Sequence, residues 1–143
     1  MITGRLWRNK FTFLGMLVTF IFSWFGQVTG TNFPRFDDAI SGLIGFSSIA
    51  TAVFMTALAF VPNFSQGILG VFETDKKFED RLLITVLLYF WTSVVGVLIL
   101  FFVPSGSDSN FATFTVSLEL SLFVGSLQES LYISYVLLRN NVK

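Results

Sequence analysis

The sequence contains neither cysteine nor histidine in its 143 residues. Their absence excludes a thiol nucleophile, an imidazole base, and any metal, haem or iron–sulfur centre that these side chains would ligate. Charged residues are also scarce, at 13%, against about 25% in a typical soluble domain. Hydrophobic residues instead make up 53% of the chain, and 19 of them are phenylalanine. This composition predicts an integral membrane protein.

Four apolar runs have the length of a membrane-spanning helix, for which about 20 residues cover a hydrocarbon core of roughly 30 Å. They cover residues 11–30, 39–61, 82–103 and 111–138, and only the last contains charged residues. The connectors are too short to hold a further domain. The sequence therefore predicts an all-α integral membrane fold. It comprises a single domain over residues 1–143, with four transmembrane helices in an antiparallel bundle.

The basic residues predict the orientation of the chain. Eight of the nine Lys and Arg residues precede the first run, follow the fourth, or lie in the connector 63–81; only Arg35 falls on the other side. Cytoplasmic loops of membrane proteins carry an excess of Lys and Arg. We therefore expect both termini and the 63–81 loop in the cytoplasm, with a bacterial inner (plasma) membrane as the default location.

Small residues recur at helical spacing within the runs, which favours close packing of helices in lipid. The packing candidates are Gly15, Ser23, Gly26, Gly45, Ser48 and Ala52. If these stripes point inward, they hold the bundle together. The stripe in run 39–61 suits contact with another subunit equally well, and both interpretations remain open.

Two carboxylic acids, Glu119 and Glu129, interrupt the fourth run. A charge at mid-membrane costs about 2.5 kcal/mol or more, so such residues usually face protein or water. They are separated by about 15 Å along a helix and share one broad side. No Lys or Arg lies inside a predicted span to pair with them, and desolvation favours the neutral acid. The other intramembrane polar candidates are Gln128, Ser126, Thr92, Ser93 and Tyr89.

Three roles for the two glutamates remain open. They could form hydrogen bonds that hold the helices together, with Ser93, Gly96 or Ser23 near Glu119 and Thr85 or Tyr89 near Glu129. They could instead line a proton or cation path. Alternatively, Glu129 could simply lie near the inner interface, because the fourth run exceeds the thickness of the membrane core.

The loop 63–81 mixes apolar and charged residues. This pattern predicts either an amphipathic segment on the inner leaflet or a docking surface for a cytoplasmic partner. Its mixed charge disfavours nucleic acid, which requires a basic surface.

The function expected from these patterns is not enzymatic, and we assign no catalytic, cofactor-binding or metal-ligating residue. A phosphate-binding loop is not apparent, and secondary transporters normally have more helices. One hypothesis is a membrane module that works through helix–helix contacts, as an accessory or regulatory subunit or as an immunity or defence component. The alternative is a homo-oligomeric cation channel lined by the two glutamates. The expected partners are the lipid bilayer and either further copies of the chain or another membrane protein.

Overall fold

The computed structural model describes residues 9–64, 74–104 and 106–141. Within these ranges the regular elements are all helical: α2 (Lys10–Phe25), a short 3-10 turn η1 (Gly30–Asn32), α3 (Phe36–Phe64), α4 (Thr74–Phe102) and α5 (Asn110–Asn141). Stretches of α3, α4 and α5 are long and apolar enough to cross a membrane, over Phe36–Phe60, Phe78–Phe102 and Asn110–Leu138. The predicted helical class is confirmed, with three helices long and apolar enough to span a membrane.

Helix α2 is shorter than the predicted span 11–30. Its 16 residues cover about 24 Å. The helix stops because the backbone closes on itself: Val28 donates to the carbonyl of Ser23 over 3.0 Å, and Gln27 donates to that of Trp24 over 3.1 Å. Gln27 has a φ of 48°. These two bonds and the left-handed residue form a Schellman motif, which ends a helix.

The cytoplasmic-loop prediction also needs correction at its edges. Helix α3 continues past Pro62 to Phe64, and α4 already begins at Thr74. The predicted loop 63–81 is therefore helical from residue 74 onward, which places Arg81 within α4. Residues 65–73, where the amphipathic or docking segment was expected, lie outside the described residues.

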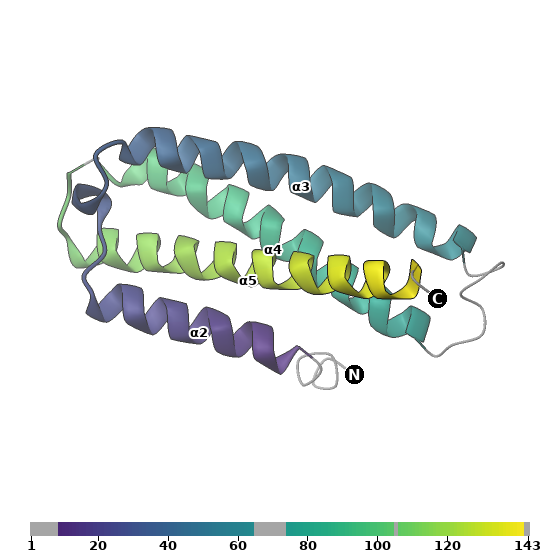
Figure 1. Cartoon of the computed structure of the whole chain (residues 1–143). Helices are drawn as coiled ribbons and strands as arrows, with labels where there is room; N and C mark the ends of the chain where they lie inside the picture. The colour runs from purple at the N-terminus through teal and green to yellow at the C-terminus, as the bar shows by residue number, and fades with distance from the viewer. Residues whose placement is uncertain (1–8, 65–73, 105, 142–143) are drawn as a thin grey trace.

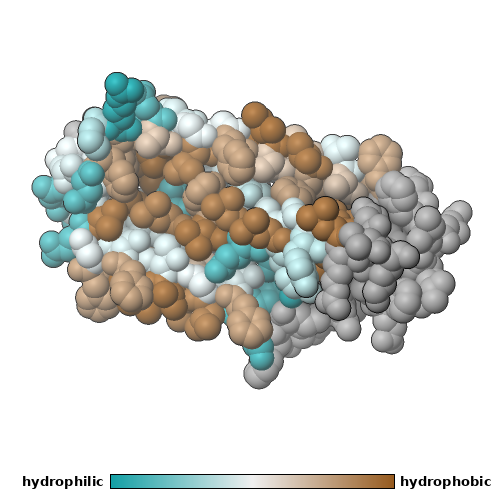
Figure 2. Space-filling view, viewed as in Figure 1, coloured by the Kyte–Doolittle hydropathy of each residue, from teal (hydrophilic) through white to brown (hydrophobic). Residues whose placement is uncertain are grey.

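The helices pack as a row in the order α3, α4, α5, α2 (Figure 1). Residues 26–35, 103–104 and 106–109 of the connectors lie at one end of the helices, and the start of α2 and the end of α5 lie at the other. Figure 2 shows hydrophobic side chains over the middle of the visible face and hydrophilic ones at the connector end. Since α2 and α3 occupy the two edges, each extensively contacts a single neighbour.

Two apolar clusters hold the helices together, one near the connector end and one near the opposite end of the helices. The cluster near the connectors joins three helices and comprises Phe36, Ile40, Ile99, Val103, Ala112 and Val116. The other cluster centres on Leu82 of α4 and Ile133 of α5. Between these clusters, the buried side chains of α5 are polar, while α4 buries Thr85, Tyr89 and Thr92 together with Val86 and Leu88.

Candidate functional site

The polar layer between the apolar clusters contains most of the predicted candidates. Thr92, Glu119, Ser126 and Glu129 are each 0% exposed. The Thr92 hydroxyl donates to the Leu88 carbonyl over 2.9 Å, and the Ser126 hydroxyl donates to the Phe123 carbonyl over 2.7 Å. Because both hydroxyls bond to carbonyls of their own helix, they are structural groups and leave the two carboxyl groups as the distinctive chemistry.

Glu129 joins three helices. Its Oε1 accepts a hydrogen bond from the Thr12 hydroxyl of α2, and its Oε2 accepts one from Nη1 of Arg81 on α4 over 3.2 Å. The same guanidinium lies over the Tyr132 ring, 3.7 Å from its centroid. The prediction that no Lys or Arg within a span pairs with either glutamate is therefore wrong for Glu129. Helix α4 begins before the apolar run, so it includes Arg81, which pairs with Glu129.

The partners expected for Glu129 bond elsewhere. Tyr89 shares a hydrogen bond of 2.8 Å with Ser130, and its ring stacks on Phe54 at 5.9 Å. The Thr85 hydroxyl donates to the Arg81 carbonyl over 2.8 Å. The Tyr89 contacts hold α4 against α5 and α3, whereas the Thr85 bond lies within α4. Neither residue takes part in the ion pair.

Glu119 lacks such partners. Neither of its carboxyl oxygens has a hydrogen bond within the described part of the chain. It lies opposite Gly96 of α4, where a Cβ atom would come within 3.2 Å of its Oε1. Ser93, another expected partner, instead shares a hydrogen bond of 3.2 Å with Ser48 of α3. A buried polar group without a partner is costly, so Glu119 is the least satisfied of the predicted candidates.

The predicted packing residues separate into two groups. On α2, Gly15 lies against the exposed Gln128 side chain, and Ser23 is buried. Gly26, predicted as a packing residue within run 11–30, is the C-cap of α2. On α3, Gly45 and Ala52 are exposed, and a Cβ atom at Gly45 would meet nothing within 4 Å.

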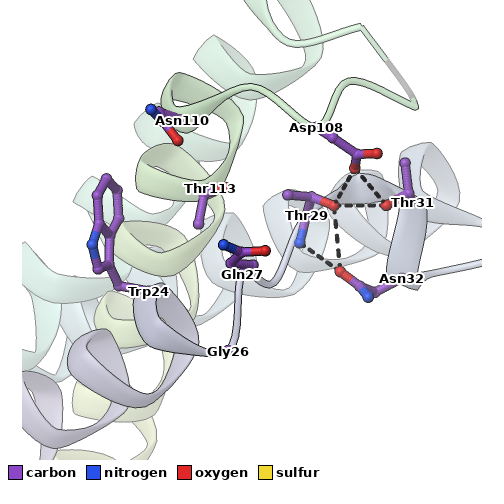
Figure 3. A pocket seen from close by; sticks show the side chains of 9 residues that line it. All are labelled: Trp24, Gly26, Gln27, Thr29, Thr31, Asn32, Asp108, Asn110 and Thr113. Atoms are coloured by element: carbon purple, nitrogen blue, oxygen red, sulfur yellow. Dashed lines mark hydrogen bonds between the residues drawn. The ribbon is translucent and has the colours of Figure 1, made fainter.

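A polar pocket at the connector end was not predicted. It has a volume of about 470 Å³ and lies between the end of α2, η1 and the start of α5 (Figure 3). Its lining consists of Trp24, Gly26, Gln27, Thr29, Thr31, Asn32, Asp108, Asn110 and Thr113. The polar residues of both connectors are visible in the sequence. That the two connectors lie close together is not, because it depends on α2 and α5 packing side by side.

Hydrogen bonds across the pocket fix its shape. The Thr29 and Thr31 hydroxyls donate to Oδ1 of Asp108 over 2.9 and 2.8 Å, and the Thr29 amide donates to Asn32 Oδ1 over 2.7 Å. The hydrogen bonds from Thr31 and then Thr29 hold the pKa of Asp108 below its usual value. Asp108 therefore remains a carboxylate at neutral pH.

Comparison with known proteins gives no match to a protein family, a curated protein or a solved structure. Nor do the described residues bring three His, Cys, Asp or Glu side chains together as a metal site. The functional proposal below therefore rests on the structure of the chain itself.

Proposed function

We propose that this protein is a non-catalytic membrane module that works through helix–helix contacts, as an accessory or regulatory subunit or as an immunity or defence component. The observation that carries this proposal is the outward face of α3. Only 6% of the most apolar stretch of α3 is buried, against 44% for those of α4 and α5. Helix α3 therefore has most of its surface available for another molecule.

The outward face of α3 suits another transmembrane helix. Gly45 and Ala52 lie on it, and a Cβ atom at Gly42 or Gly45 would meet nothing of this chain within 4 Å. Small residues allow the backbones of two helices to approach closely in lipid. Because the backbone polar groups of a partner at this depth must be satisfied internally, we propose a transmembrane helix of a different membrane protein as the occupant.

The proposed topology has four spans in an antiparallel bundle, with both termini in the cytoplasm of a bacterial cell. Contacts between α2 and α5 support the fourth span. Thr12 bonds to Glu129, whereas Trp24 packs against Phe114 with their ring centroids 5.9 Å apart. Helix α2 thus lies beside the candidate span of α5 at the same depth and runs in the opposite direction, although it is shorter.

Cysteine crosslinking tests the contact role, because the chain has no cysteine of its own. Ala52→Cys places a thiol on the outward face of α3. Leu87→Cys places a matched thiol on α4, where the side chain is 47% exposed. In native membranes we expect a crosslinked heterologous protein in equal stoichiometry from Ala52→Cys and none from Leu87→Cys. A product containing only two copies of this chain, or no product, would overturn the proposed partner.

The second candidate, a cation channel, is favoured only by the unpartnered carboxyl of Glu119. Both glutamates are 0% exposed and face other helices of the same chain, whereas a lumen shared between subunits needs them on the protomer surface. Ion flux into liposomes distinguishes the two functions. The module predicts the same flux for the wild type and Glu119→Gln, while a cation flux that falls in Glu119→Gln would support the channel.

A further inference from the structure

The pocket at the connector end has a lining whose chemistry selects a ligand class. Three amide side chains line it, from Gln27, Asn32 and Asn110, together with three threonines, the Asp108 carboxylate and the Trp24 ring. Amides both donate and accept hydrogen bonds, as do hydroxyls. A ligand with several hydroxyl groups, each able to act in both ways, is complementary to this set. The volume of about 470 Å³ falls within the usual range for small-molecule sites, about 300–1,000 Å³.

Charge excludes an anionic ligand. The residues lining the pocket include Asp108 and no lysine or arginine. Only Oδ1 of Asp108 accepts the threonine hydroxyls, so Oδ2 is available as a further acceptor. A phosphate or carboxylate would meet a negative charge without a compensating cation. A neutral ligand that donates hydroxyl groups suits this carboxylate.

Trp24 supplies an apolar wall on the opposite side of the pocket from Asp108 (Figure 3). Its ring stacks on Phe20 with centroids 6.2 Å apart and makes a T-shaped contact with Phe114, with centroids 5.9 Å apart. These contacts hold the indole in a fixed position. A rigid aromatic ring beside hydrogen-bonding groups suits a saccharide or polyol ring, which has apolar C–H faces and polar edges.

The backbone at Gln27 points to the same pocket. Gln27 has a φ of 48° and occupies the position after the helix end where glycine is usual, while Gly26 lies one residue too early. A side chain other than glycine is strained in this conformation. Strained residues of this kind cluster at ligand-binding sites, and the Gln27 amide lines the pocket.

We propose that this pocket binds a neutral, hydroxyl-rich ring, such as a saccharide. Trp24 forms the apolar wall, and Gln27, Asn110 and Asp108 provide hydrogen bonds. The ligand could be a free sugar or the headgroup of a glycolipid, because the pocket adjoins Asn110, the first residue of the α5 span. This inference concerns the opposite end of the protein from the glutamate–arginine pair and does not depend on the outward face of α3.

The test uses the full chain in phosphatidylcholine nanodiscs, since maltoside detergents would themselves present a sugar. Replacing Trp7 and Trp91 by Phe leaves Trp24 as the single tryptophan. Glucose and N-acetylglucosamine are titrated and followed by fluorescence and calorimetry, with glycerol 3-phosphate as the anionic probe and ethanolamine as the cationic one. We expect saturable binding of a neutral sugar and none of glycerol 3-phosphate. The titration is repeated in discs that contain glucosyl diacylglycerol. If the free sugar no longer binds in these discs, the glycolipid headgroup occupies the pocket.

Two variants locate the binding. Asn110→Ala and Gln27→Gly should each weaken the binding of the sugar at least tenfold. Because glycine relieves the strain at position 27, Gln27→Gly should keep or raise the Tm, which separates weaker binding from misfolding. Gln128→Ala, near the middle of α5 and outside the pocket lining, should leave the affinity unchanged. Three results would each overturn the proposal. The first is tighter binding of ethanolamine than of the sugars, and the second is unchanged affinity in both pocket variants. The third is the absence of binding both for the sugars in plain discs and for the glycolipid.

Discussion

Two glycines of this protein have opposite surroundings. A Cβ atom at Gly96 would lie 2.7 Å from Cγ1 of Ile44 and 3.2 Å from Oε1 of Glu119, whereas one at Gly45 would meet nothing within 4 Å. We therefore expect Gly96→Ala to lower the free energy of unfolding by about 1–3 kcal/mol through overpacking. Gly45→Ala should leave it unchanged or raise it by up to about 1 kcal/mol, because alanine favours the helix.

Thermal unfolding of both variants in the same detergent measures this difference. Since each substitution adds one methyl group to a helical glycine, Gly45→Ala is the matched control for the packing effect. Equal stability of the two variants would show that α3 and α4 do not approach each other at Gly96 as closely as described.

The ion pair at Glu129 should show strong energetic coupling. Arg81→Met removes the guanidinium from the buried Glu129 carboxylate, and Glu129→Gln removes the negative charge that this guanidinium contacts. The Arg81 side chain is 21% exposed while that of Glu129 is 0% exposed, so the Arg81 charge is the better solvated. We expect Arg81→Met to be the more destabilising single change, since an uncompensated buried charge is costly.

A double-mutant cycle with Arg81→Met and Glu129→Gln isolates the coupling from the other contacts of each residue. We expect an interaction of roughly 0.5–3 kcal/mol, with the double variant more stable than the sum of the single changes predicts. Purely additive effects in chemical denaturation would mean that the pair does not contribute to holding α4 against α5.

At the scale of elements, Asp108 connects η1 to the α4–α5 connector. Hydrogen bonds from Thr31 and Thr29 lower its pKa. A depressed pKa in the folded state stabilises the fold above the unfolded value, about 3.9. That contribution is lost as the pH falls through the folded value. We therefore expect the connection to be constant at neutral pH and to weaken only in acid.

Titration of the Asp108 carboxyl by NMR measures this effect. Replacing Thr29 and Thr31 by Val removes both hydroxyls with little change in shape, so the titration midpoint should rise toward about 3.9. Thr56→Val, on α3, serves as the control and should leave the midpoint unchanged. A midpoint that does not move in the Thr29 and Thr31 double variant would contradict the assigned cause.

The elements that sequence predicts well are those defined by local composition. Helices α3, α4 and α5 follow from long apolar runs. The end of α2 does not, because it depends on Gln27 adopting a left-handed conformation that its residue type disfavours. The start of α4 was misplaced because hydropathy marks where lipid begins, whereas the helix extends through polar residues to Thr74.

For the sites too, the sequence shows which residues are present but not which residues they contact. The presence of Glu119 and Glu129 in a span is visible in the sequence, but their partners depend on how helices align in three dimensions. Arg81 reaches Glu129 only because α4 and α5 pack together at that register. The pocket likewise requires Thr29 and Asp108, far apart in the chain, to meet at one end.

At the scale of the whole molecule, the two helices at the edges of the row, α2 and α3, differ in where their small residues point. Helix α2 turns its small residues toward α5, where Gly15 lies against Gln128, while α3 turns Gly45 and Ala52 away from its neighbour α4. An inward stripe completes the fold of one chain, and an outward stripe favours assembly. The proposed contact role therefore depends on α3, and the proposed topology depends on whether α2 crosses the membrane.

Whether α2 crosses the membrane is settled by the side on which Lys10 lies. Single cysteines at positions 10, 37 and 143 can be labelled with a membrane-impermeant maleimide, because the chain has no native cysteine. With four spans, Asp37→Cys reacts in intact cells, while Lys10→Cys and Lys143→Cys react only after permeabilisation. With three spans, Lys10→Cys would react together with Asp37→Cys, since α2 and α3 would then begin on the same side. We expect the first pattern: the contacts of Thr12 with Glu129 and of Trp24 with Phe114 keep α2 beside α5 over most of its length.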